Sequence, residues 1–300
     1  MKLKNERLEI TFKDSSKMNT PRFCHVGFIT EVLLDGKYQF CMPEQVISGR
    51  RNSKGEGLCG EFVLATGELA KAGEWFHKPG VGLVKQTADH QRFNIFGTYE
   101  VQSAPVEMKY QTEDSVCFFQ RGILCNGYCT DIQKTYRLQD NQLILEIEVT
   151  NTGSKKFELS EYQHNFIALE NLPVGPGYLL DLPCDNNISA LSDATLRWGD
   201  EEKMPSIVSA EGSTVRWTAS ADNRVLYHES YDVNSDAPCH WKLCHAQSPL
   251  SVMEEVSFQP GMIIVWSVEH CICAEFYQTV KLMPGEKAQW TRIWTFENQA

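Results

Sequence analysis

Two short stretches place a side chain that can transfer protons within an alternating, largely apolar pattern. In EYQHNFIALE, alternation puts His164 on the same strand face as Tyr162. In CICAEFYQTV, it puts Glu275 on the same face as Tyr277. An imidazole titrates near neutral pH and a carboxylate accepts protons. A histidine and a glutamate in one pocket can therefore act as general acid and general base.

Each residue also has a structural interpretation. His164 can be a core histidine whose ring nitrogens bond to backbone groups. Glu275 can belong to a structural ion pair, because a buried carboxylate must be paired, hydrogen-bonded or neutralised. The two stretches taken separately leave both interpretations open.

The elements that would position these residues are β-strands. LEITF and LILEIEVT alternate with a period of two residues, which is typical of half-buried strands. A helical apolar pattern is weak and is best at 59–72. The sequence predicts one all-β domain of antiparallel sheets over residues 1–300. Further strands are expected at 23–33, 92–101, 106–111, 115–121, 132–138, 157–169, 215–219, 262–267, 270–280 and 288–296.

Composition narrows the class of partner. The formal net charge of −11 disfavours a nucleic acid or an anionic membrane, since both require clustered Lys and Arg. MKLKNERLEITF carries charges where a signal peptide would be apolar, and no apolar run approaches the roughly 20 residues of a membrane span. We therefore expect a cytoplasmic protein whose 11 cysteines are mostly buried thiols.

One segment suggests a metal site. CHWKLCH places Cys239, His240, Cys244 and His245 close together, and these are zinc-type ligands. Structural zinc sites usually join two separated ligand pairs, and no second pair has suitable spacing. We predict no metal requirement. We also predict no cofactor, because nucleotide-binding glycine motifs are absent from the sequence.

The ordered set of motifs resembles a known family. YQHNF followed by NLPVGPGYLL, and then a late CAEFYQ before LMPGE, is similar to the galactose mutarotase-like (aldose 1-epimerase) superfamily. GEWFHKPGVGLVKQ resembles a segment of a divergent branch of it. The resemblance implies a large antiparallel β-supersandwich, with His164 as general acid and Glu275 as general base. The early Asn-Arg pair of typical members is matched only loosely, by HQRFNIFG.

The resemblance also implies a small-molecule carbohydrate as substrate and the interconversion of its anomers. We expect His164 and Glu275 to face each other across a space the size of one hexose. Their proximity should raise the pKa of His164 and lower that of Glu275, unless desolvation dominates. Lys78 and Arg92 suggest an anionic substituent on the sugar. The candidate substrate-binding residues are His77, Lys78, Arg92, Tyr162 and Trp241.

Two alternatives stay open at the level of sequence. On the same fold, the protein can be an isomerase, epimerase or lyase that acts on a sugar acid or sugar phosphate. It can also be a non-catalytic sugar-binding module. The sequence does not distinguish a monomer from a homodimer.

Overall fold

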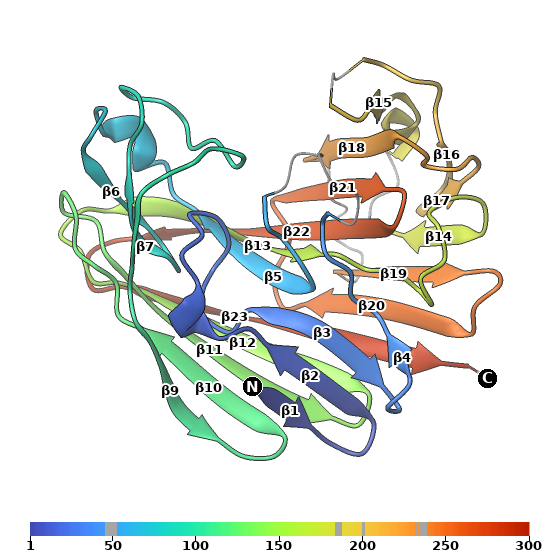
Figure 1. Cartoon of the computed structure of the whole chain (residues 1–300), viewed down its shortest axis with the longest axis horizontal. Helices are drawn as coiled ribbons and strands as arrows, with labels where there is room; N and C mark the ends of the chain where they lie inside the picture. Colours follow the sequence, from blue (N-terminus) through green and yellow to red (C-terminus); the bar gives the residue numbers. More distant parts are fainter. Residues whose placement is uncertain (46–52, 184–187, 200–201, 232, 234–238, 300) are drawn as a thin grey trace.

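Two large antiparallel β-sheets form most of the computed structural model (Figure 1). The structure describes residues 1–45, 53–183, 188–199, 202–231, 233 and 239–299. Both large sheets have ten strands, and a third sheet has three. Within the described residues the only helices are three short 3-10 segments: η1 (Ser15–Lys17), η2 (Gly67–Leu69) and η3 (Ile188–Asp193).

The first sheet carries the residues singled out above. Its strands, in spatial order, are β1 (Lys2–Lys4), β2 (Leu8–Phe12), β3 (Ile29–Leu34), β5 (Leu58–Val63), β13 (Phe157–Asn165), β22 (Cys271–Leu282), β21 (Met262–Val268), β18 (Arg224–Ser230) and β15 (Thr195–Arg197), with β4 (Tyr38–Gln39) paired to β3.

The second sheet packs against the first. Its strands, in spatial order, are β16 (Val208–Glu211), β17 (Thr214–Trp217), β14 (Tyr178–Asp181), β19 (His240–His245), β20 (Leu250–Val256), β23 (Lys287–Asn298), β12 (Gln142–Asn151), β11 (Thr130–Gln139), β10 (Ser115–Gln120) and β9 (Val106–Gln111). The small sheet of β6 (Trp75–Lys78), β7 (Gly82–Lys85) and β8 (Val101–Ser103) lies at one end of the molecule.

Alternation builds the core between the large sheets. Leu143, Leu145 and Ile147 of β12 are buried, whereas the residues between them are partly or fully exposed. Ile272 and Phe276 of β22 enter the same apolar cluster from the first sheet. The all-β, antiparallel fold class predicted from the sequence is confirmed. Among the described residues, no helix is long and apolar enough to cross a membrane.

Three local predictions were wrong. The segment 59–72 contains strand β5 and the short 3-10 helix η2 instead of an α-helix. Five of the six residues of β5 are buried, so this strand lacks the alternation that reveals a half-exposed one. The predicted strand at 92–101 is a mostly exposed loop that ends where β8 begins. The predicted strand at 23–33 begins only at Ile29.

The core also contains a buried charged network. Arg292 of β23 has no exposed surface and pairs with Glu161 of β13 at 2.7 Å and with Glu254 of β20 at 2.7 Å. Trp290 donates to Glu161, and Trp241 donates to Glu254. One guanidinium thus joins the two sheets through two carboxylates, and each carboxylate has further hydrogen-bond donors.

Removing this guanidinium should be far more damaging than removing an exposed one. Arg292→Met leaves Glu161 and Glu254 buried without their cation, and we expect a loss of about 3–5 kcal/mol in the free energy of unfolding. The control is Arg137→Met, which breaks the half-exposed pair with Glu146 and should cost at most about 1 kcal/mol. Urea unfolding of the variants measures both. Equal losses would contradict this role for Arg292.

Candidate active site

The candidate site lies where two neighbouring strands of the first sheet separate. β13 and β22 pair from Phe157 to Glu161 of β13, and they meet again only at the bridge between Ile167 and Ile272. Between Glu161 and this bridge, β13 pairs with β5 and β22 pairs with β21. His164 and Glu275 lie on opposite sides of this split.

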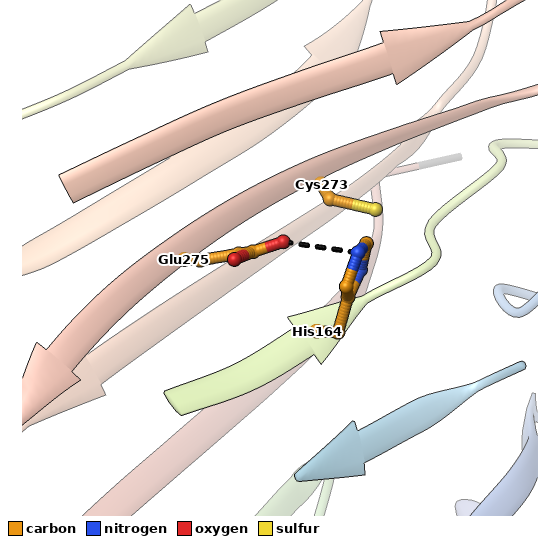
Figure 2. A group of neighbouring side chains, drawn as sticks. All are labelled: His164, Cys273 and Glu275. Atoms are coloured by element: carbon orange, nitrogen blue, oxygen red, sulfur yellow. Dashed lines mark ion pairs between the residues drawn. The ribbon is translucent and has the colours of Figure 1, made fainter. Parts of the chain in front are cut away.

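Strand parity points both side chains to the same face of the sheet, away from the core. Asn165 and Ala274, the neighbours of His164 and Glu275, belong to the interior. His164 Nε2 lies 3.2 Å from Glu275 Oε1, and the two side chains are 9% and 4% exposed (Figure 2). The structure therefore brings the predicted pair into direct contact. The sequence analysis expected a hexose-sized space between the two side chains. The structure has a direct contact instead.

The interior network fixes the backbone on both sides of Glu275. Asn165 Nδ2 donates to the carbonyl of Ala274 at 2.8 Å, and Arg292 Nη2 donates to the carbonyl of Phe276 at 2.9 Å. These side-chain donors satisfy carbonyls of β22 within the split, where the ladder with β13 is interrupted. The buried network thus helps to set the position of Glu275 relative to His164.

Burial controls the protonation of the pair. Desolvation raises the pKa of Glu275 to about 8, although the nearby charge of Arg22 opposes the shift. Desolvation, with the charge of Arg22 acting in the same direction, holds the pKa of His164 well below its usual value. Desolvation therefore outweighs the mutual attraction of the two groups. Both shifts favour the uncharged form of each group, a protonated carboxyl beside a neutral imidazole.

Beside the pair lies a buried cluster of two cations and one carboxylate. Arg22 Nε and Lys78 Nζ donate to Glu61 at 2.7 and 2.8 Å, and the Tyr162 hydroxyl donates to the same carboxylate at 2.5 Å. Burial opposes the charge of Glu61, yet Lys78 and Arg22 lower the pKa of Glu61 to about 2. Glu61 thus holds both Lys78 and Tyr162, and the Tyr162 ring lies 6.3 Å from the His164 ring.

Aromatic rings surround His164. Phe166 stacks parallel to the imidazole, with ring centroids 3.9 Å apart, and Trp266 packs edge-on at 5.6 Å. Tyr277 stacks on Tyr162 at 4.4 Å, and its hydroxyl donates to Glu275 Oε2 at 3.4 Å. Trp266 and Tyr277 are only half-buried, so their rings can contact a ligand.

The sequence analysis did not identify five of these neighbours as site residues, and one of them, Phe166, lies on the same strand face as His164. Tyr277 is two residues after Glu275 and therefore lies on the same strand face. This alternation could have identified it as a site residue. Trp266, Arg22 and Glu61 come from other segments, and their approach depends on strand pairing and on the path of the loop before β3.

Two predicted substrate-binding residues, His77 and Trp241, lie elsewhere. His77 is buried, with its ring nitrogens at 3.0 Å from the Ile123 carbonyl and 2.9 Å from Thr130 Oγ1, and burial lowers its pKa to about 4. Trp241 lies between the two large sheets, where it donates to Glu254 at 2.6 Å. Arg92 is exposed in the loop before β8, and its charge acts on Tyr231 beyond β18.

The cysteine- and histidine-rich segment does not form a metal site as a unit. It is largely strand β19, where Cys244 and His245 are consecutive and point to opposite faces. Among the described residues, one other group brings three possible metal-ligating side chains together: donor atoms of His164, Cys273 and Glu275 all lie within 4.8 Å of one another (Figure 2).

The raised pKa of Glu275 predicts a specific dependence of stability on pH. The unfolded chain loses this proton near pH 4.5, whereas the folded chain keeps it to about pH 8, so the group's contribution to stability falls as pH rises through that window. Glu275→Gln keeps a neutral hydrogen-bonding side chain, and it should gain more than about 1 kcal/mol relative to wild type between pH 5 and pH 8.

Urea unfolding at both pH values measures this difference. Glu158→Gln, which changes an exposed carboxyl on the same strand as His164, is the control and should leave the pH dependence as in wild type. A parallel pH dependence in wild type and Glu275→Gln would show that the carboxyl is not buried as described.

Comparisons with known proteins locate the fold. No family model and no curated protein matches the chain. Several solved structures match the chain. A galactose mutarotase-like protein from Lactobacillus casei aligns over 99% of both chains with a TM-score of 0.60 and 13% identity. A putative aldose 1-epimerase from Escherichia coli aligns over 99% of this chain and 98% of its own, with a TM-score of 0.59 and 11% identity.

A third structure, the Slr1438 protein from Synechocystis, aligns over 100% of this chain and 96% of its own with a TM-score of 0.60 and 11% identity. At such identities the likeness concerns the fold, and it extends over nearly the whole length of each of these chains. Together with the paired antiparallel sheets, it shows that this chain has the galactose mutarotase-like fold that the sequence resemblance predicted.

Proposed function

We propose that the protein interconverts the anomers of an aldose by proton transfer through Glu275 and His164. The observation that carries this proposal is the buried contact of 3.2 Å between His164 Nε2 and Glu275 Oε1. One of the structures with a similar fold, from Escherichia coli, is a putative aldose 1-epimerase, which agrees with this proposal. The chemistry needs only a group that takes a proton and a group that gives one.

Direct contact of the pair suits this reaction. Anomer exchange removes the proton of the anomeric hydroxyl while the bond between C1 and the ring oxygen breaks, and the ring oxygen receives a proton. Both oxygens are bonded to C1, so the two proton-transfer groups must lie side by side. After rotation about the bond to C1, the reverse steps close the ring in the other anomer.

The single shared proton makes the pair competent. With Glu275 protonated and His164 neutral, the imidazole accepts the proton of the anomeric hydroxyl and the carboxyl protonates the ring oxygen. Closure runs these transfers backwards and restores the starting state. In this proposal the roles are the reverse of those that the family resemblance implies, because desolvation raises the pKa of Glu275 and lowers that of His164. The half-exposed rings of Trp266 and Tyr277 offer apolar surface to the sugar.

Loss of either group should nearly abolish exchange. His164→Asn and Glu275→Gln should each lower kcat/KM by about 10²-fold or more, with the fold unchanged. In wild type, kcat/KM should fall as pH rises above about 8, where the pair loses its proton. Because the pKa of His164 is depressed, activity should persist below pH 6.5. Exchange spectroscopy by NMR over a panel of aldoses measures these rates. Wild-type rates in either variant would exclude the mechanism.

One observation favours a second candidate, in which the substrate is a sugar acid or sugar phosphate. Arg22 and Lys78 share the single carboxylate of Glu61, so this cluster carries a surplus positive charge beside the pair. A charged hydrogen bond is worth about 1.5–3 kcal/mol, which corresponds to roughly a ten- to hundredfold preference for an anionic ligand.

Ligand affinity tests this candidate. A hexose, its uronic acid and its 6-phosphate are compared in wild type and in Lys78→Met, with Lys85→Met as control because Lys85 is half-buried at the neighbouring strand and pairs outward with Glu100. The anionic preference should appear in wild type and in the control, and should shrink in Lys78→Met. Equal affinities for all three ligands in wild type would leave neutral aldoses as the substrate class.

A further inference from the structure

We propose that His164, Cys273 and Glu275 form a binding site for a single Zn²⁺ ion. The three side chains come from neighbouring strands, and each is less than 10% exposed. Their nitrogen, sulfur and oxygen donors all lie within 4.8 Å of one another (Figure 2). Among the described residues this is the only group of three such donors that converges so closely.

The donor spacing suits one small cation. Zn²⁺ binds nitrogen and oxygen at about 2.0–2.2 Å and sulfur at about 2.3 Å, so donors around a tetrahedral ion are about 3.3–3.7 Å apart. The His164–Glu275 contact of 3.2 Å already approaches this spacing. The thiol must approach by about 1 Å or less, which side-chain rotation can supply.

Chemistry selects the class of ion. A thiolate, an imidazole and a carboxylate together favour Zn²⁺ over Mg²⁺ or Ca²⁺, which prefer oxygen donors alone. When bound, the two anionic donors balance the charge of the ion. The nearby cations Arg22 and Lys78 are held by Glu61, which reduces their repulsion of a metal ion.

Two features of the site fit a bound ion, although Cys273 also packs in an apolar cluster with Cys271 and Phe166. His164 Nδ1 is buried and has no hydrogen-bond partner, so the imidazole is free to turn either nitrogen toward a ligand. Cys273 is fully buried beside the pair, although proton transfer to and from a sugar requires no thiol. A zinc ion at this position would take the Cys273 thiolate and one imidazole nitrogen as ligands.

Occupancy would have a functional consequence, which rests on the proposed function. Zinc would occupy the lone pairs of Glu275 and His164 that accept protons. Anomer exchange should therefore stop when the ion binds and resume when a chelator removes it. The site would act as a reversible, zinc-dependent brake on the same residues.

Metal titration of the full-length protein tests the site without reference to activity. Co²⁺ replaces Zn²⁺ as the probe, because a thiolate bound to Co²⁺ absorbs by charge transfer whereas carboxylate and imidazole ligands do not. We expect one equivalent of Co²⁺ with this absorption in wild type, displaced by Zn²⁺. Cys273→Ser should abolish the absorption and weaken Zn²⁺ binding by about a hundredfold or more, since even outer contacts of a metal site contribute 10–100-fold.

Cys59→Ser is the matched control. Cys59 is a buried thiol on the strand beside His164, outside the group of three donors, and its variant should bind Co²⁺ as wild type does. If Cys273→Ser does not fold, His164→Asn replaces it, with the same loss expected. The site is disproved if wild type shows no stoichiometric thiolate absorption, or if the absorption persists without Cys273.

Exchange rates with and without Zn²⁺ then test the brake. Each variant is compared with its own metal-free rate, and Zn²⁺ should slow wild type and Cys59→Ser but not Cys273→Ser. If no aldose is exchanged by metal-free wild type, the proposed function fails while the Co²⁺ titration still decides the zinc site. Zinc that binds without slowing exchange would overturn the brake alone.

Discussion

The buried guanidinium of Arg292 is the constraint on which the candidate site depends. It has no exposed surface, and it joins β23 and β20 of one sheet to β13 of the other through Glu161 and Glu254. The same group also donates to the carbonyl of Phe276, next to Glu275. Stability of the sandwich and placement of a site carboxyl thus share one interaction.

This arrangement explains how a sheet can open without leaving polar backbone groups unsatisfied. A continuous ladder between β13 and β22 would set neighbouring residues in ordinary pleated positions. The split instead exchanges ladder hydrogen bonds for donors from Asn165 and Arg292. The freed space is where His164 and Glu275 meet, on the side facing away from the core.

Desolvation then decides the electrostatics. A carboxylate and an imidazolium at 3.2 Å would attract each other strongly, but both are removed from water, and burial penalises both charged forms. Burial therefore favours the uncharged form of both groups. On the same sheet face, Glu61 has a lowered pKa because two cations compensate for its burial. Two glutamates on one sheet face therefore hold opposite protonation states, which is how one fold can supply a proton donor beside a fixed anion.

The sequence alone determined the class of fold and the face of each strand. Alternation in β2 and β12 has a period of two residues, and this follows from the pleat whatever the neighbouring strands are. It correctly put Tyr162 with His164, and Tyr277 with Glu275. Ordered motifs also predicted the galactose mutarotase-like fold. Tertiary structure decided which faces meet, because strand order joins segments more than 100 residues apart. It moved Trp241 into the core, buried His77 in a separate set of contacts, and brought Arg22 and Glu61 beside the pair. It also decided where the proton rests, since desolvation depends on all the atoms packed around a group and no local pattern of residues specifies them.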